Sequence, residues 1–142
     1  MRVHVLLLLF AACEKCKSDS CSAEDVSMTY IHKQWKPPVQ KFEKECMLET
    51  GLEQYVLNEF YESPDIPDNY HFKCQLKCYG MKMGILSSTG DINVEKWVDL
   101  FDYMNVALAE KCVQMVKEED LCEKSYLLVK CVNDELSKQY PS

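Results

Sequence analysis

The chain has 142 residues, nine of them cysteines, and carries 23 acidic against 16 basic side chains, for a net charge of −7. This length suits a single domain. The acidic balance disfavours nucleic acid and anionic membranes as partners, because both repel a negative surface, so we expect no nucleic-acid partner and no membrane insertion.

The N-terminus has the pattern of a secretory signal. A short basic start precedes an apolar run at 5–12, which is far shorter than the roughly 20 residues that span a bilayer. Three cleavage positions compete: after Cys13, after Ser18 or after Ala23. We predict a signal peptide at 1–23, ending between 13 and 23, and a secreted domain at 24–142. Removing 1–23 takes away three cations and two anions, so the net charge moves from −7 to −8.

The first two helices are expected before a break at 63–68. Pro37 and Pro38 suit the first turn of a helix, where no amide partner is lost. Gly51 suits the left-handed cap at its end. The second helix carries an apolar stripe made of Leu52, Val56 and Phe60.

The stretch FKCQLKCYGMKMG is expected to lie in a third helix, from about 69 to 83. Asp68 suits the cap at its start and Gly84 the closure at its end. Cys74 and Cys78 then lie on one face, a turn apart.

Three further helices are expected after a turn at 87–91. Asn93 caps the fourth, whose inner face carries Val94, Trp97, Val98, Phe101 and Met104. The fifth is marked by Val106, Ala109, Val113 and Val116. Asp120 and Glu123 resemble a capping box at the start of the sixth, along which Leu121, Ser125, Leu128, Val132 and Leu136 share one side. No window alternates strictly, so we expect an all-α fold with almost no sheet.

Cysteine use indicates an oxidising compartment. Cleavage after Ala23 leaves six cysteines, an even number that implies three disulfides in a secreted chain of this length. Cleavage after Ser18 would leave Cys21 as an odd thiol. The C-x2-C-x4-C spacing at 13–21 has no nearby histidine, so we expect no metal site.

Helix geometry limits how the six cysteines pair. Positions four apart on one helix lie on parallel tracks, which disfavours Cys74–Cys78. Cys122 and Cys131 lie nine apart, on opposite faces of one helix. Six cysteines allow 15 arrangements; each excluded pair removes three, and one arrangement contains both, so ten stay open. In all ten, Cys74 and Cys78 each form a disulfide with a cysteine elsewhere in the chain. The third helix is therefore linked to the rest of the molecule at two points.

Disulfides that close long loops hold helices together without complete packing between them. Each contributes about 3–4 kcal/mol in the chain-entropy model, which permits a cavity that otherwise costs stability. A cavity lined by aliphatic and aromatic side chains would accept an apolar guest. The alternative is a fully packed interior, in which the disulfides only stabilise a small extracellular protein. The cysteine spacing alone does not decide between the two.

The cysteine order resembles that of the insect odorant-binding proteins. The six cysteines are separated by 27, 3, 33, 9 and 8 residues; only the 33 is slightly short for many members of that family. The stretches FKCQLKCYGMKMGILSSTGDINVEKW and LCEKSYLLVKCV resemble the family's third-helix and last-helix regions. The resemblance covers essentially the whole mature chain.

This resemblance implies a pairing, a fold and a role. The family pairs its first cysteine with the third, the second with the fifth and the fourth with the sixth, which gives Cys46–Cys78, Cys74–Cys122 and Cys112–Cys131. It implies a compact six-helix domain, stapled by disulfides around an internal apolar cavity. It also implies a carrier of a small hydrophobic molecule, such as an odorant, pheromone or similar semiochemical, in sensillar lymph or another extracellular fluid.

The resemblance further implies a ligand-binding set, by position from the cysteines: Leu76, Gly80, Ile85, Leu86, Leu100, Phe101, Val106, Ala109, Leu128 and Val132. Val39 and Phe60 are weaker candidates, and an ordinary core role suits each position at least as well. The expected partner is a small apolar organic ligand, with a chemosensory receptor as a further candidate. We expect a monomer or a weak homodimer.

No enzyme, cofactor or metal is expected. A phospholipase-like site needs a His–Asp pair beside helical cysteines and a Gly-rich calcium loop. The mature chain has only His32 and His71, neither in that setting, and Asp91 lacks the flanking carboxylates of a calcium loop. Oxidised cysteines disfavour Cys–His catalysis. The alternative to a carrier is a secreted interaction or structural protein on the same scaffold, without a ligand pocket.

Overall fold

The computed structural model describes residues 26–141, and the predicted signal peptide lies outside them. Within this range the chain is mostly helical, and the one extended pairing is an antiparallel bridge between Leu86 and Ile92. The predicted all-α class is confirmed. Between residues 26 and 141, no helix combines the length and the hydropathy needed to cross a bilayer.

The first helical stretch runs from residue 28 to residue 50 in four consecutive pieces. They are α2 (Met28–Gln34), α3 (Lys36–Val39), the 3-10 turn η2 (Gln40–Phe42) and α4 (Glu43–Thr50). Pro37 lies in the first turn of α3, as predicted. The preceding helix α2 is an addition to the prediction, and Ser27 caps it by accepting the Tyr30 N–H. Gly51 closes α4 in the left-handed conformation, with φ 75°, as predicted.

Five separate helices follow, so the described chain forms six helical units. They are α5 (Gln54–Glu62), α6 (Tyr70–Lys82), α7 (Val94–Leu100), α8 (Val106–Met115) and α9 (Leu121–Gln139). The predicted six-helix domain is therefore confirmed. The fourth predicted helix ends earlier than expected, which leaves Phe101 and Met104 in the loop after α7.

Asparagine and aspartate side chains cap the later helices. The caps are Asn69 for α6, Asn93 for α7, Asn105 for α8 and Asp120 for α9. The predicted Asp68 cap is wrong by one position. Asn69 Oδ1 accepts the Phe72 N–H at 3.0 Å, whereas Asp68 forms an ion pair with Lys73 at 3.1 Å.

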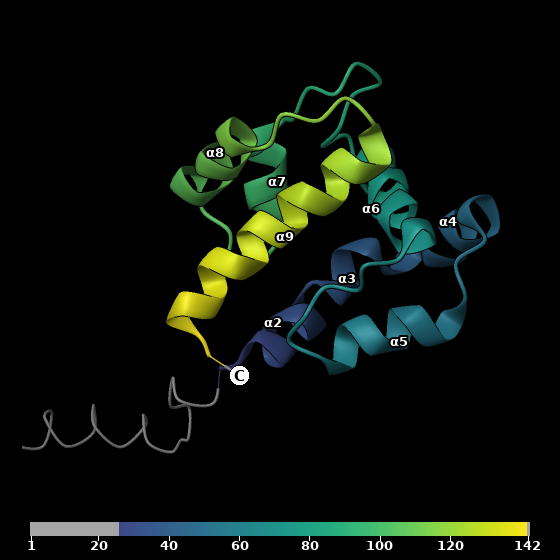
Figure 1. Ribbon diagram of the computed structural model, residues 1–142, viewed down its shortest axis with the longest axis horizontal. Helices are drawn as coiled ribbons and strands as arrows, with labels where there is room; N and C mark the ends of the chain where they lie inside the picture. Colours follow the sequence, from purple (N-terminus) through teal and green to yellow (C-terminus); the bar gives the residue numbers. More distant parts are fainter. Residues whose placement is uncertain (1–25, 142) are drawn as a thin grey trace, which may run out of the picture.

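Three disulfides connect the helices. They join α4 to α6 (Cys46–Cys78), α6 to α9 (Cys74–Cys122) and α8 to α9 (Cys112–Cys131). These pairs are the ones that the resemblance implies. α6 carries two of them and packs along α9, which crosses the molecule between α6 and the α7–α8 pair (Figure 1).

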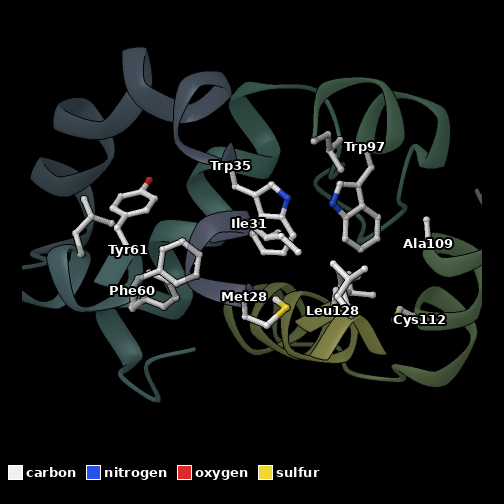
Figure 2. Packing of buried hydrophobic residues seen from close by; sticks show 14 of the residues in the cluster. Met28, Ile31, Trp35, Phe60, Tyr61, Trp97, Ala109, Cys112 and Leu128 are labelled. Atoms are coloured by element: carbon white, nitrogen blue, oxygen red, sulfur yellow. The ribbon is translucent and has the colours of Figure 1, made fainter. Parts of the chain in front are cut away.

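The main hydrophobic cluster lies where the first helical stretch, α5, α6 and α9 meet. Its fully buried members include Met28, Ile31 and Phe72. In Figure 2, Met28 and Ile31 share one interior with the aromatic rings of α5 and α7, while Ala109 and Cys112 of α8 lie at the edge. The centre of the domain is therefore built mainly by the other helices, and α8 packs outside them.

Candidate ligand-binding site

An apolar cavity of about 110 Å³ lies inside the helical shell. Its wall comes from α3, α5, α6, α7 and α9, from the loops on both sides of α7, and from Trp35 at the α2–α3 junction. Neither α4 nor α8 contributes a wall residue. A mainly apolar wall of this kind favours a guest that leaves water for hydrophobic reasons.

The structure brings together seven of the ten residues in the implied ligand-binding set. The seven that line the cavity are Leu76, Gly80, Ile85, Leu86, Phe101, Leu128 and Val132. The two weaker candidates, Val39 and Phe60, also line it. They come from α3, α5, α6, α9 and the loops on both sides of α7.

The other three residues of that set lie away from the cavity. Leu100, at the end of α7, is 40% exposed, and Val106, at the start of α8, is 46% exposed. Ala109 is fully buried but packs in the core cluster without reaching the cavity wall. The physical reason for the last two is the position of α8, which packs on the outside of α9 and α7.

Several wall residues are absent from the implied set although their spacing was informative. On α6, Phe72 and Tyr79 share a helical stripe with Leu76, at intervals of four and three residues. On α5, Leu57 precedes Phe60 by three residues and Tyr61 by four, so both tyrosine and phenylalanine lie one helical turn after Leu57. Extending each stripe by one helical turn would have identified them.

Gly80 allows the loop after α6 to fold back and form wall. The Gly80 carbonyl accepts the N–H groups of Ile85 and Leu86 at 2.8 and 3.0 Å. A side chain at this position would place its Cβ only 3.2 Å from Leu86 Cβ. Glycine therefore permits the close approach that brings Ile85 and Leu86 to the cavity.

The aromatic part of the wall is fixed by a buried histidine. His32 stacks on Phe60 and on Trp35, with ring centroids 4.3 and 5.4 Å apart. Its Nδ1 lies 2.9 Å from the Phe60 carbonyl oxygen, and its Nε2 lies 2.7 Å from Asn133 Oδ1. The Trp35 indole N–H donates to the Asp102 carbonyl at 2.8 Å. These contacts fix two wall aromatics against α9 and the loop after α7.

Three residues of the mainly apolar wall carry hydroxyl groups: Tyr61, Tyr79 and Ser125. The Ser125 hydroxyl donates to the Leu121 carbonyl at 2.8 Å. The Tyr61 hydroxyl donates to Glu43 Oε2 at 3.5 Å, and the Tyr79 hydroxyl accepts from Gln75 Nε2 at 3.0 Å. Burial, and then the neighbouring Tyr79 and Glu43, raise the pKa of Tyr61 far above its ordinary value. The Tyr61 phenol therefore stays protonated. Residues 26–141 contain no cluster of three or more side chains suited to hold a metal.

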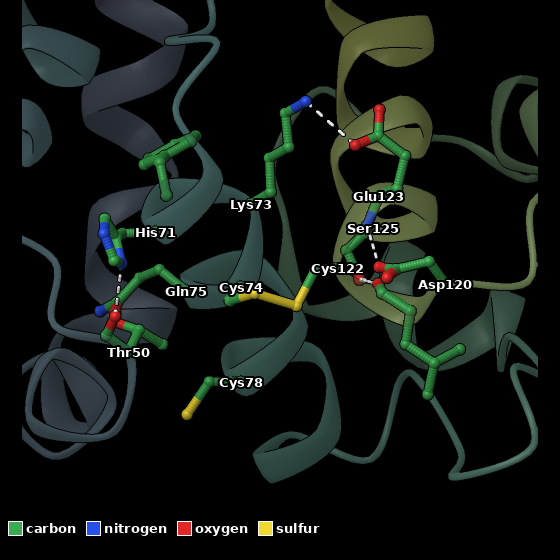
Figure 3. The surroundings of a disulfide bond; sticks show 12 residues. Thr50, His71, Lys73, Cys74, Gln75, Cys78, Asp120, Cys122, Glu123 and Ser125 are labelled. Carbon is green, nitrogen blue, oxygen red and sulfur yellow. Dashed lines mark hydrogen bonds and ion pairs between the residues drawn. A yellow bond between two sulfur atoms is a disulfide. The ribbon is translucent and has the colours of Figure 1, made fainter.

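Figure 3 shows how the cavity wall is secured where α6 meets α9. The Cys74–Cys122 disulfide joins the two helices. Next to these cysteines in sequence, Lys73 and Glu123 form an ion pair, with 3.0 Å between Lys73 Nζ and Glu123 Oε1. Lys73 Nζ also lies 4.4 Å from the centroid of the Tyr126 ring. The two helices, each of which supplies four wall residues, are thus joined covalently and electrostatically.

Comparison with known proteins identifies the family. The model of the PBP/GOBP family matches residues 29–135. General odorant-binding protein 57e of Drosophila melanogaster is 24% identical over 94 residues, which cover 63% of this chain and 69% of that protein.

Two solved structures share the fold. The crystal structure of the odorant-binding protein lmigOBP1 of Locusta migratoria gives a TM-score of 0.61 at 21% identity and covers 78% of this chain and 84% of that one. Odorant-binding protein dmelOBP28a of Drosophila melanogaster gives 0.59 at 21% identity, over 76% and 97% of the two chains. The members of the matching family are non-enzymatic carriers. The chain belongs to the PBP/GOBP family of insect odorant-binding proteins.

Proposed function

We propose that the protein is a secreted carrier that takes one small hydrophobic molecule into the cavity between α5, α6 and α9 and transports it through an extracellular fluid. The observation that carries this proposal is the apolar cavity of about 110 Å³ inside a disulfide-linked shell. Membership of an odorant-binding family makes an odorant, a pheromone or a similar semiochemical the natural guest. The seven wall residues of the implied set are the proposed ligand contacts.

The cavity volume limits the guest. An engineered apolar cavity of about 150 Å³ in another protein stays dry and binds benzene. The cavity here is somewhat smaller, so a body of about one ring fits without movement of the wall. Larger guests require the side chains of the wall to move outward.

Calorimetric titration with α-methylstyrene and with acetophenone tests the proposal. Each compound is a single benzene ring with one small substituent. We expect saturable binding of one molecule per protein, with a negative heat-capacity change because apolar surface is buried. If neither compound binds, the proposal fails, and an interaction or structural protein on the same scaffold becomes the better reading.

A cavity-filling substitution locates the site. Leu76→Trp adds bulk directly at the cavity wall and should weaken binding of α-methylstyrene at least about tenfold, through loss of space. Leu48→Trp is the matched control, because Leu48 is 88% exposed on α4, a helix that contributes no wall residue. Unchanged binding by a folded Leu76→Trp variant would show that the guest sits elsewhere.

A further inference from the structure

A buried amide behind the cavity wall hydrogen-bonds to the wall residue Tyr79. Gln75 on α6 has no exposed surface. Its Nε2 donates to the Glu43 carbonyl at 3.2 Å and to the Tyr79 hydroxyl oxygen at 3.0 Å, while its Oε1 accepts from the Thr50 hydroxyl at 2.9 Å. A carbonyl oxygen only accepts, so the amide nitrogen must face Glu43, and both amide hydrogens are then used.

This arrangement leaves Tyr79 with an unused donor. The Tyr79 oxygen accepts the Gln75 hydrogen bond, so its own hydroxyl hydrogen must find a different acceptor. The hydrogen bonds formed within residues 26–141 include none that Tyr79 donates. Tyr79 is 5% exposed and lines the cavity. A buried donor without a partner is unfavourable, which makes this hydroxyl a candidate for contact with a guest.

Tyr61 provides the internal comparison. It lines the same cavity and is similarly buried, but its hydroxyl already donates to the Glu43 carboxylate. The hydrogen of the Tyr61 hydroxyl therefore has an acceptor inside the protein, and that of Tyr79 has none among the described residues. The two phenols differ in what they offer a guest, although both belong to the wall.

The Glu43 carboxylate brings a negative charge close to these tyrosines, while the Lys36 Nζ atom lies over the ring of Tyr61, 5.1 Å from its centroid. Burial is the main cause that raises the pKa of the Tyr79 phenol; the Gln75 amide acts in the opposite direction, and the nearby Glu43 carboxylate adds to the rise. The phenol therefore stays protonated and remains a donor. A guest that brought a carboxylate to the same place would be repelled by Glu43 and would lose its hydration.

We infer that Tyr79 is a specificity-determining residue, whose hydroxyl donates to an oxygen acceptor on an otherwise apolar, uncharged guest. A carbonyl, an ether or a hydroxyl group would supply that acceptor. The chain Thr50–Gln75–Tyr79 holds the donor in place, and its linked hydrogen bonds polarise one another. This inference rests on the proposed carrier function and narrows it to guests with one polar end.

A ligand pair that differs in one group tests the inference. Acetophenone and α-methylstyrene have nearly the same shape, but the first carries C=O where the second carries C=CH2. Tyr79→Phe should weaken acetophenone binding about three- to tenfold, the equivalent of one net hydrogen bond. It should change α-methylstyrene binding less than about twofold. Calorimetry on the wild-type protein and the variant measures both.

Tyr61→Phe is the matched control, because it removes the same atom from the same wall. It should affect the two ligands equally. Equal losses for both ligands in Tyr79→Phe would assign Tyr79 a packing role and overturn the inference, as would a loss confined to acetophenone in Tyr61→Phe. Benzoate binding as tight as that of acetophenone would refute the preference for an uncharged guest. If the wild-type protein bound neither neutral ligand, the carrier function itself would fail instead.

Discussion

At the residue scale, His32 links three helices. The ring belongs to α2, stacks on Phe60 of α5 and contacts Asn133 of α9. The Asn133 amide also donates to the Pro64 carbonyl at 3.1 Å. His32 is fully buried and Asn133 is 5% exposed. Such a polar contact stabilises the fold only while each partner is satisfied, so loss of one side should be costly.

Asn133→Leu should lower the free energy of unfolding by about 1–3 kcal/mol, because the His32 ring then loses a partner in a site without solvent. Asp134→Leu is the control at the next position, where the side chain is exposed and pairs only with Lys130. That change should stay within about 0.5 kcal/mol. Urea unfolding of both variants measures the difference, and equal losses would mean that the histidine contact contributes nothing specific.

The start of α9 illustrates what a local motif can and cannot predict. Asp120 Oδ1 accepts the Glu123 N–H at 3.0 Å, which confirms the first half of the predicted capping box. The second half is missing, because the Glu123 carboxylate pairs with Lys73 and the Asp120 N–H donates to Glu118 instead. The cap depends on neighbours in the chain and was predictable. The competing cation comes from α6, fifty residues away, and no local pattern indicates it.

At the scale of elements, the three disulfides differ in what they hold. Cys74–Cys122 joins α6 to α9, and both helices supply cavity wall. Cys112–Cys131 joins α9 to α8, which supplies none. The two bridges close 48 and 19 residues, so the chain-entropy model gives each a contribution of about 3–4 kcal/mol. Their effects on stability should thus be similar and their effects on binding different.

Paired substitutions separate the two bridges. Cys74→Ser with Cys122→Ser should lower stability by a few kcal/mol and also weaken α-methylstyrene binding, because the wall helices lose their covalent link. Cys112→Ser with Cys131→Ser should lower stability comparably but leave binding within about threefold, a change of less than 1 kcal/mol. Unfolding curves and calorimetric titrations of both double variants measure this. A larger loss of binding in the α8–α9 variant would contradict the assignment of the wall.

The elements themselves were largely predictable from their end signals. Asn93 and Gly51 mark a start and an end where expected. The missed α2 begins at Met28, after its Ser27 cap, and buries Met28 and Ile31 by packing against α5 and α9. These contacts come from parts of the chain far away in sequence. In the loop after α7, Tyr103 adopts a left-handed conformation, φ 72°, which is uncommon for a residue other than glycine and is not indicated by its identity.

At the scale of the whole molecule, the fold tolerates incomplete packing around a pocket of about 110 Å³. Incomplete packing lowers stability, and the three disulfides act in the opposite direction by stabilising the folded state. The cysteine spacing was therefore enough to predict the fold, through its resemblance to the family, and to suggest a cavity. The cavity's volume and polar end depend on how side chains of α4, α5 and α6 meet, which spacing along the chain does not encode.

Binding of a guest in the cavity should stabilise the folded protein. A guest that binds only the folded state raises the free energy of unfolding by about 2.7 kcal/mol at one hundred times its dissociation constant. We expect the melting temperature to rise steadily with α-methylstyrene concentration in the wild-type protein and to stay nearly constant in Leu76→Trp. Thermal unfolding followed by circular dichroism measures both. Equal rises in the two proteins would indicate binding outside the cavity.

The aromatic contact of Tyr103 with both Tyr30 and Tyr140, at 6.5 and 5.6 Å between ring centroids, brings the beginning of α2 and the end of α9 to one pole (Figure 1). The helices could therefore be connected in a different order along the chain and still pack in the same arrangement. A circular permutant that links residue 141 to residue 26 through a short peptide, and that opens at the exposed Ser88, would keep all three crosslinks and the same interior.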